Sequence, residues 1–506
     1  MAVSESTIFV ISDLHLGGRP HPRSQSDGPP GSRINSSYLQ LTQFIDWLAV
    51  EGTHQGKLEL VINGDIVDFL LADEVSPDPS PWTSDEDEIV KRLDAIVENS
   101  RETGGRGPFD ALADFCGMAA DGKVTLVLLL GNHDLELSLP KVRQHFIKKV
   151  LRSDGRGVRF VYDNECYCRG DLLIEHGNRY DSLNAVNHDS LRRVRSAMSR
   201  EEDHSCRSGG KFTPPGGSVL VTELFNPLKK IYRFLDLLKP EREAVLPLML
   251  ALEPRATEMI SAIVTYSKVS LCSTPSSVVG GEIDPGYIAA DQDIGTSLDL
   301  STLLRDALGS EADVFDVSAG GQIGAADAWK AIKEMKRRSR EWVIGVDHGI
   351  LAGRNRKQLS VALRKLAKDS TFSLHLEVDP YLSEAKRLAS SGRFSTIVFG
   401  HTHLPKQIHI ERSGLPPAQY LNTGTWADVM LVPPEVKGSG PDAEKEIDLF
   451  LERLASNQLN TVRYLSYAKI HLLEEGGEEK VQSAEIHSYL SLRQPDGDPL
   501  MEAGDE

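Results

Sequence analysis

Cysteine is scarce in this 506-residue sequence, and long apolar runs are absent. The five cysteines are odd in number and include no Cys-x-x-Cys pair, so we expect reduced thiols in a reducing compartment. Cys166 and Cys168 are expected to share one face of a strand. No run approaches the roughly 20 apolar residues of a membrane-spanning helix, and the first apolar segment is only strand-length with no basic segment before it. These absences predict a cytoplasmic protein without a transmembrane segment.

Basic residues are too few to balance the acidic ones. The sequence has 56 Lys and Arg against 74 Asp and Glu, a formal net charge of -18. This balance disfavours sequence-independent binding to the phosphates of nucleic acid. A nuclease whose contacts with nucleic acid are local stays an open alternative. Part of the acidity lies at residues 84–88 and in the tail, residues 494–506, where proline and glycine interleave with acidic residues. We predict that this acidic tail is disordered.

Five short motifs hold residue types that bind metals and move protons. In chain order they are Asp13-Leu14-His15, Gly64-Asp65, Gly131-Asn132-His133-Asp134, His176-Gly177 and Gly400-His401-Thr402-His403. An isolated Asp or His is more often a cap or a core polar group than a ligand. Here each motif follows a short apolar run, typical of a strand buried on both faces: residues 8–11, 58–62, 124–130, 172–174 and 396–399. Because ligands gather at the carboxyl ends of such strands, the motifs indicate one shared site.

This mixture of carboxylates, an amide and imidazoles suits a pair of divalent metal ions. Two ions about 4 Å apart repel each other strongly, and a bridging carboxylate lowers the cost of holding both. Neutral imidazole and amide ligands keep the site positive, so an anionic phosphate can still bind. Nitrogen and oxygen donors together suit Mn, Fe, Zn or Ni better than Ca or Mg, although Mg stays open on ligand type alone. Among these ions we expect Mn first.

The motifs resemble the pattern D-x-H, G-D, G-N-H-D/E, H and G-H-x-H of the calcineurin-like metallophosphoesterases. The resemblance implies that one ion is held by two carboxylates and two imidazoles: Asp13, His15, Asp65 and His403. Asp65 then bridges to the second ion, whose shell is completed by an amide and two imidazoles: Asn132, His176 and His401. His133, paired with Asp134, is implied as the histidine outside both shells that protonates the leaving oxygen.

The fold implied by the resemblance is α/β, a four-layer α/β/β/α sandwich. Between His176 and Gly400, however, the chain is far longer than a compact member of the family needs. We therefore assign residues 1–182 and 375–493 to a discontinuous core and residues 183–374 to a large, mainly helical insertion. Because the insertion leaves the core beside His176, it is expected to form a cap over the site. The alternatives are a stabilising subdomain, an oligomer interface or a docking surface for a protein partner.

The chemistry implied is hydrolysis of a phosphomonoester, phosphodiester or pyrophosphate bond by a hydroxide that bridges the two ions, with His133 as general acid. The segment from Glu175 to Asp181 is similar to bacterial phosphoesterases of the UDP-diacylglucosamine pyrophosphatase type, although those usually carry Arg where this chain has His133. Within this segment, Asn178 and Arg179 are candidate substrate-binding residues. Two other functions stay open: a DNA or RNA nuclease of the Mre11 type, and a partner-binding scaffold on a phosphoesterase fold.

Overall fold

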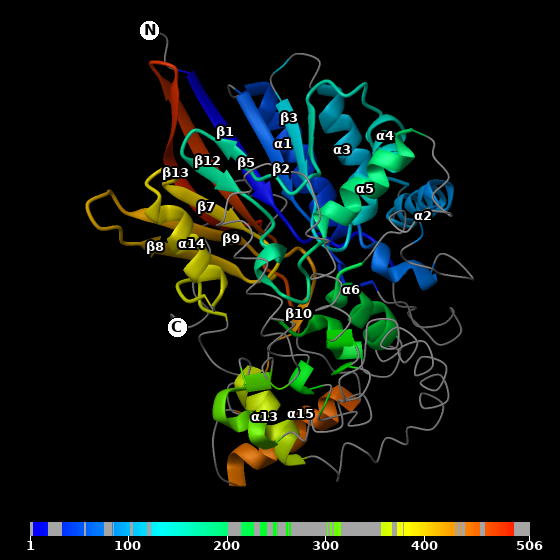
Figure 1. Ribbon diagram of the computed structural model, residues 1–506, viewed down its shortest axis with the longest axis vertical. Coiled ribbons are helices and arrows are strands. Elements are labelled where there is room, and N and C mark those ends of the chain that lie inside the picture. Colours follow the sequence, from blue (N-terminus) through cyan, green and yellow to red (C-terminus); the bar gives the residue numbers. More distant parts are fainter. Residues whose placement is uncertain are drawn as a thin grey trace, which may run out of the picture.

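The computed structural model describes the strands and helices of the core and part of the predicted insertion (Figure 1). The described residues are 4–18, 33–54, 57–74, 83, 85–101, 105–118, 122, 124–200, 214–226, 233–239, 246–248, 250, 260–261, 263–264, 301, 304–305, 308–314, 356–366, 372–377, 379–430, 432, 436, 441–455 and 461–489. The predicted acidic tail, residues 494–506, lies outside them. Within these residues no helix has the length and apolar character needed to cross a membrane.

Two mixed sheets form the centre of the molecule. The first contains β1 Ser4–Ile11, β2 Lys57–Asn63, β3 Val124–Leu129, β4 Val158–Val161, β12 Ser466–Glu475 and β13 Glu478–Ser488. The second contains β5 Tyr167–Arg169, β6 Leu172–Ile174, β7 Thr396–Phe399, β8 Pro405–Ile410 and β9 Ala418–Thr423. A separate two-stranded ribbon pairs β10 Val429–Met430 with β11 Thr461–Val462.

The strand order brings distant parts of the chain together. The first sheet has the order β13-β12-β1-β2-β3-β4, in which β1 to β4 are parallel and β12 joins β1 in antiparallel register. The second has the order β5-β6-β7-β9-β8, with β6, β7 and β9 parallel. The motif-bearing strands β1, β2 and β3 therefore end at one edge of the first sheet, and β6 and β7 end together in the second. The strands predicted from the five apolar runs are confirmed.

Helices cover the outer faces of both sheets. The α-helices bounded within the described residues are α1 Tyr38–His54, α2 Glu86–Asn99, α3 Pro108–Gly117, α4 Pro140–His145, α5 His188–Met198, α6 Gly216–Leu220, α13 Arg356–Leu366, α14 Tyr381–Ser390 and α15 Pro441–Ala455. Shorter helical turns are η2 Phe69–Glu74, η4 Leu135–Ser138, η5 Phe146–Val150, η6 Asn178–Tyr180, η7 Val221–Phe225, η8 Arg233–Leu237 and η9 Gly309–Val314. The local sequence explains several boundaries; α2, for example, begins where the Asp85 side chain accepts hydrogen bonds from the backbone N–H groups of Asp87 and Glu88.

The alternation of side chains along buried strands divides the interior into three apolar layers. On β1, Phe9 points into the cluster beneath α1 and α3, whereas Ile8 and Val10 point into the cluster between the two sheets. On β7, Val398 joins the cluster between the sheets, and Phe399 joins a third cluster against α14. Helix, sheet, sheet and helix are thus stacked in that order, which confirms the predicted four-layer sandwich.

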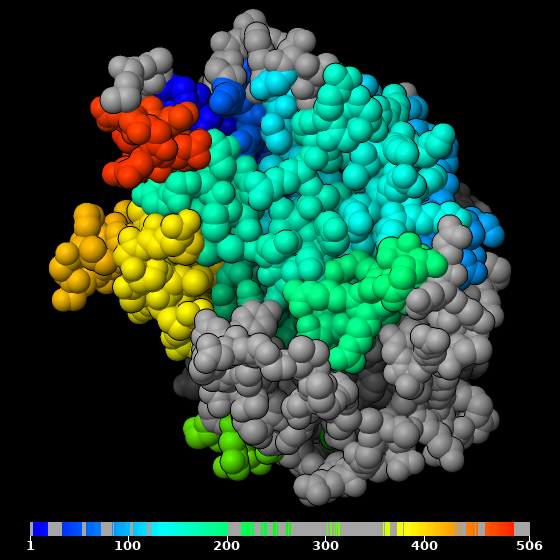
Figure 2. Space-filling model, turned by 45° about the horizontal axis from the view of Figure 1, so that its top comes forward, coloured from blue at the N-terminus to red at the C-terminus, as the bar shows by residue number. Residues whose placement is uncertain are grey.

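Two features modify the predicted organisation. First, α5 lies within the residues assigned to the insertion, but its Leu191 and Val194 belong to the core cluster beneath α1 and α3. The surface of α5 (green) is continuous with that of the first half of the chain (cyan) in Figure 2. Second, α15 lies between β10 and β11 within the predicted core, yet Glu444 of α15 pairs at 3.2 Å with Arg364 of α13, which belongs to the predicted insertion. The helical region therefore includes residues after 375, and the domain boundaries stay a prediction.

Candidate metal centre

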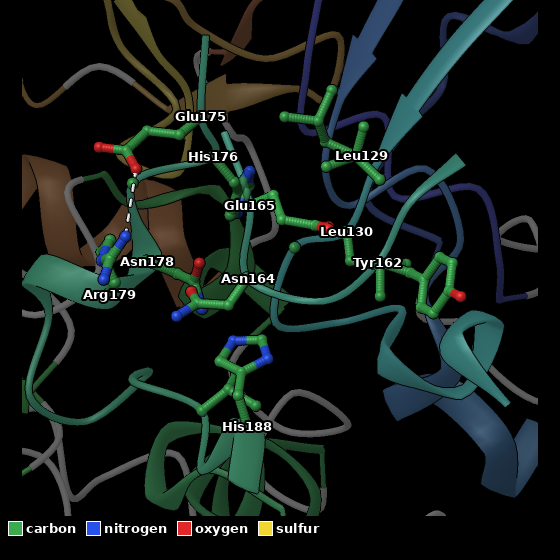
Figure 3. A pocket seen from close by; sticks show the side chains of 14 residues that line it. Leu129, Leu130, Tyr162, Asn164, Glu165, Glu175, His176, Asn178, Arg179 and His188 are labelled. Atoms are coloured by element: carbon green, nitrogen blue, oxygen red, sulfur yellow. Dashed lines mark ion pairs between the residues drawn. The ribbon is translucent and has the colours of Figure 1, made fainter. Parts of the chain in front are cut away.

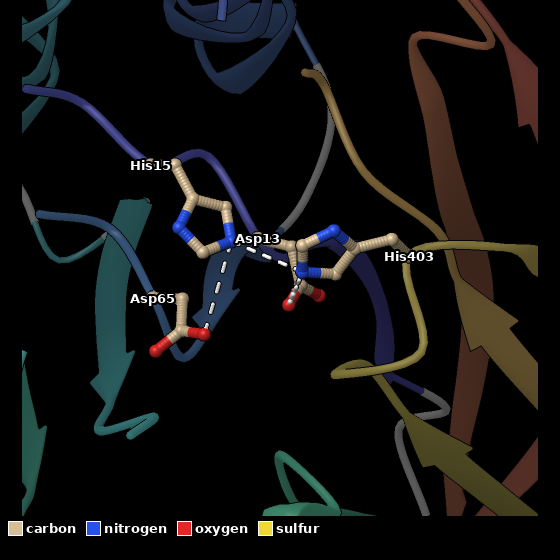
Figure 4. A group of neighbouring side chains, drawn as sticks. All are labelled: Asp13, His15, Asp65 and His403. Carbon is tan, nitrogen blue, oxygen red and sulfur yellow. Dashed lines mark hydrogen bonds and ion pairs between the residues drawn. The ribbon is translucent and has the colours of Figure 1, made fainter. Parts of the chain in front are cut away.

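The loops after β1, β2 and β7 bring four predicted ligands into one buried group (Figure 4). The potential ligand atoms of Asp13, His15, Asp65 and His403 all lie within 4.8 Å of one another. A second group, within the same limit, consists of Asp65, His176 and His401. Asp65 belongs to both groups, which is the position that a bridging carboxylate needs. His176 Nε2 lies 3.3 Å from Asp65 Oδ2, and His403 Nε2 lies 3.2 Å from Asp13 Oδ1.

The donor atoms of these groups fit metal ions. Within the described part of the chain, the buried atoms without a hydrogen-bond partner include Asp13 Oδ1, Asp65 Oδ2 and His176 Nε2 of these groups, and Oδ1 of the predicted ligand Asn132. Each such atom costs about 1–3 kcal/mol in a fold that leaves it without a partner. The other ring nitrogen of His176, Nδ1, donates to the Asn63 carbonyl at 2.7 Å, which leaves the lone pair of Nε2 directed at Asp65. Converging lone pairs from carboxylate, amide and imidazole are what a divalent cation requires.

Backbone strain is concentrated at the predicted ligands. Among the described residues other than glycine, eight have φ between 45° and 69°. Five of the eight are predicted ligands: Asp13, His15, Asp65, His401 and His403. This conformation costs a non-glycine residue of order 1–3 kcal/mol and persists where the surroundings impose it, often at functional sites. The strain therefore supports a shared function for these loops.

Glycines and cross-loop hydrogen bonds hold the strained loops together. A Cβ atom on Gly64 would collide with the His176 ring, and one on Gly131 would collide with the Asp65 carboxylate. The Asp13 N–H donates to the Gly64 carbonyl at 3.2 Å, and the His15 N–H donates to the Asp65 carbonyl at 2.9 Å. The motif glycines are thus needed because backbone and ligand side chains approach each other too closely for any larger residue.

Neighbouring charges shift the pKa values of two predicted ligands, Asp13 and His176, in opposite directions. Burial favours the neutral form of Asp13, but the nearby His403 and His176 outweigh it and lower the pKa of Asp13 to about 2. Burial likewise disfavours a charged His176, yet the carboxylates of Asp65 and Asp13 raise its pKa to about 10. The site therefore attracts positive charge at the position of His176 Nε2, where a proton and a metal ion would compete.

His133 has a different carboxylate partner from the one expected. Its Nδ1 lies 3.2 Å from Oδ1 of Asp68, which is three residues after Asp65. The His133 ring contacts the His15 ring edge-on, with 4.6 Å between the ring centroids. Burial favours the neutral form of Asp68, but the neighbouring His133 and His15 hold its pKa far below the ordinary value. An ionised Asp68 favours the tautomer of His133 that carries its proton on Nδ1. The role of Asp68 was not predicted from the sequence, although Asp68 lies only three residues after Asp65.

Asp134, the partner predicted for His133, supports the backbone instead. Its Oδ1 accepts from the Gly131 N–H and its Oδ2 accepts from the Ile66 N–H, both at 2.8 Å. The pairing of Asp134 with His133 is thus corrected, because both oxygens are directed at the loops after β2 and β3. Burial and the charge of Asp65 raise the pKa of Asp134 to about 7, although these two hydrogen bonds favour its ionised form. Asp134 fixes the relative position of the two loops that carry Asp65 and His133.

A polar chain that was not predicted from the sequence connects Asn132 with His401. Asn132 Nδ2 donates to Asn184 Oδ1 at 3.3 Å, and Asn184 Nδ2 donates to Asp181 Oδ2 at 2.8 Å. The same Asp181 oxygen lies 3.3 Å from His401 Nε2, which leaves Nδ1 of His401 as its potential ligand atom. Two predicted ligands of the second ion are therefore oriented by one network.

Asn178 and Arg179, the candidate substrate-binding residues, are not part of either ligand group. Asn178 Nδ2 donates to the Asn184 carbonyl at 2.9 Å, and Arg179 pairs with Glu175 at 3.6 Å. Both line a hollow beside His176, into which the His188 ring points (Figure 3). These contacts explain how the two residues are held, while their role in substrate binding stays a prediction.

Described parts of the predicted insertion reach the loops of the site. Ser218 Oγ donates to the Asn132 carbonyl at 3.4 Å, and Asn226 Nδ2 donates to the Leu70 carbonyl at 2.7 Å. Lys239 is only 2% exposed. Burial and the positive charge of Lys239 lower the pKa of His403 to about 4, so this ammonium group acts directly on a predicted ligand.

Comparison with known proteins gives one family. The sequence model of the calcineurin-like phosphoesterase family matches residues 6–221. This range contains four of the five motifs and ends within η7, so it includes α5 and α6. A search of curated proteins gives no match.

Proposed function

Since residues 6–221 belong to the calcineurin-like phosphoesterases, a family of metal-dependent phosphoester hydrolases, we propose that this chain hydrolyses a phosphate ester with two divalent ions, Mn first among them. The observation that carries the proposal is the position of Asp65. Its carboxylate is shared by two groups of ligand atoms, and its Oδ2 is buried without a hydrogen-bond partner. A single-ion site has no need for a carboxylate placed between two groups.

The predicted ligands divide into two sets, one for each ion. Asp13, His15 and His403 would hold one ion and Asn132, His176 and His401 the other, with Asp65 between them. When bound, the two ions would supply charge for the phosphate and lower the pKa of water to about 7, which provides a nucleophile.

His133 is the proton donor to the leaving oxygen, and Asp68 keeps its Nδ1 protonated and its ring fixed. A serine or cysteine nucleophile is not required. Catalysis by a positioned imidazole of this kind contributes about 100-fold to 10,000-fold in rate.

The predicted insertion serves in this proposal as a cap that contributes to substrate binding. Ser218 and Asn226 anchor it to the loops after β3 and β2, and Lys239 brings a buried positive charge beside His403. A cation at this position favours a phosphate group that approaches the ions, because opposite charges attract strongly where water is excluded. The cap would also limit the size of the ester that can enter.

Hydrolysis of p-nitrophenyl phosphate and bis-p-nitrophenyl phosphate with added Mn tests the proposal. We expect activity with one of the two esters, two ions per chain, and loss of both ions and activity in Asp65→Asn. Single-stranded DNA should be cleaved slowly if at all, since the net charge of -18 disfavours its approach. Undiminished turnover with two bound ions in Asp65→Asn would contradict the bridging assignment.

A further inference from the structure

A pair of thiols lies outside the phosphoesterase chemistry. Cys168 belongs to β5, and Cys166 immediately precedes that strand, so the two side chains emerge on the same face. Their Sγ atoms are 3.5 Å apart, and both residues are half-buried. Both pack at the edge of the apolar cluster between the second sheet and α14. No step of the proposed hydrolysis uses them.

The separation of the two sulfurs fits a shared ligand better than a disulfide. A disulfide needs an S–S distance of about 2.05 Å, and residues two apart in a strand have Cα atoms roughly 6.5 Å apart, near the upper limit for bridging. By contrast, two sulfurs 3.5 Å apart that each lie about 2.3 Å from one ion subtend roughly 100° at that ion, close to tetrahedral. Chelation therefore requires little backbone movement.

We propose that Cys166 and Cys168 form a chelating dithiol site for a thiophilic centre with two adjacent open coordination positions, such as a soft divalent cation or a trivalent arsenical. The hydrogen bond between the two thiols favours the thiolate, the reactive form, of Cys166. The hydrogen bond from the Cys168 thiol lowers the pKa of Cys166 to about 7 against the effect of burial. The pKa of Cys168 is raised by the same bond, so Cys166 is the sulfur that attacks first.

Phenylarsine oxide is a suitable probe because it reacts with two thiols together. Two S–H bonds and one As–O bond are broken, two As–S bonds are formed, and one water leaves with both protons and the oxygen. Arsenic stays trivalent, so no oxidant or reductant is needed. Because closure of the second bond is intramolecular, the adduct should be at least about 100-fold tighter than that of a single thiol.

The experiment measures the intact mass of the metal-loaded full-length protein after incubation with phenylarsine oxide and a wash with excess 2-mercaptoethanol. We expect one retained adduct per chain that dimercaptopropanol removes. Cys166→Ser and Cys168→Ser should each lose the adduct, and Cys116→Ser, which alters a buried single thiol, should keep it. Circular dichroism confirms that each variant is folded.

Either of two results would overturn the proposal. The first is no retained adduct on the wild-type protein. The second is an adduct on folded Cys166→Ser or Cys168→Ser that is as tight as that of the wild type, which would assign the reaction to other thiols. A Cys166→Ala, Cys168→Ala double variant supplies a second test if the serine variants do not fold. Phosphoesterase activity does not enter this measurement, so its outcome is independent of the proposed function.

Discussion

Replacing Asp68 and Asp134 separately by asparagine should separate proton transfer from loop support. In Asp68→Asn the carboxylate that faces His133 Nδ1 at 3.2 Å becomes an amide of nearly the same shape. The amide no longer stabilises a charged imidazole, and its N–H₂ group favours the wrong tautomer of His133. We expect hydrolysis of esters with poor leaving groups to slow about 100-fold or more, which corresponds to about 2.7 kcal/mol or more in the barrier.

Asp134→Asn should lower the stability of the fold without a selective effect on esters with poor leaving groups. The amide offers one acceptor where the carboxylate accepts from the N–H groups of both Gly131 and Ile66. One buried N–H then loses its partner, which lowers the free energy of unfolding by about 1–3 kcal/mol. The rate should fall by a similar factor for good and poor leaving groups, because His133 keeps its partner.

A series of aryl phosphates with leaving groups of increasing pKa provides the assay, and denaturant unfolding together with the metal content of each variant provides the controls. The slope of log rate against leaving-group pKa should steepen in Asp68→Asn and stay unchanged in Asp134→Asn. The reverse pattern would refute the assignment of Asp68 and restore Asp134 as the partner of His133. Loss of metal in Asp68→Asn would show instead that Asp68 acts through His15, whose Nδ1 lies 3.6 Å from it.

Four further outcomes are expected. Asp65→Asn should lose both ions and all activity while its thermal unfolding stays cooperative, as metal analysis and calorimetry would show. A chelator should abolish hydrolysis, and added Mn should restore more of it than Mg does; equal recovery would contradict the preference for Mn. Lys239→Met should raise KM more than it lowers kcat, whereas an effect on kcat alone would exclude a role in substrate binding. Burial and the charge of Arg192 lower the pKa of His188 from 6.5 to about 4, so the unfolded chain takes up a proton first and stability should fall as the pH drops from 6.5 to 4. Because glutamine does not titrate, the stability of His188→Gln should fall by up to about 3 kcal/mol less than that of the wild type over this pH range. An unchanged pH dependence of the free energy of unfolding would contradict this role of His188.

Much of the fold follows from local patterns in the sequence. Continuous apolar runs predicted the strands, because a strand buried on both faces needs apolar residues at every position. The positions of Asp13, Asp65 and His401 directly after such runs then predicted that they would meet. The left-handed φ of these residues could not be predicted, since it results from hydrogen bonds between loops that are distant in sequence.

Which side chains pair with each other was harder to predict than which residues come together at the site. Asp134 follows His133 directly, so adjacency suggested a pair, but successive residues in a turn point in different directions. Asp68 reaches His133 only because the loops after β2 and β3 lie side by side. The pairing of α15 with α13 through Glu444 and Arg364 likewise joins segments that are distant in sequence. Tertiary contacts, and not local preference, decide these features.

The position of Asp13 has a consequence for the order in which this protein can be completed during synthesis. The Asp13 carboxylate accepts from the His401 N–H at 3.0 Å, and the Asp13 carbonyl accepts from the Thr425 hydroxyl at 2.6 Å. The neighbouring strand β1 is joined on one side by β12, which begins only at Ser466. A nascent chain therefore exposes an unpaired strand edge and an incomplete set of ligands until most of it has left the ribosome. Metal loading should accordingly be a late event, and fragments that end before residue 400 should bind ions poorly and be prone to aggregation.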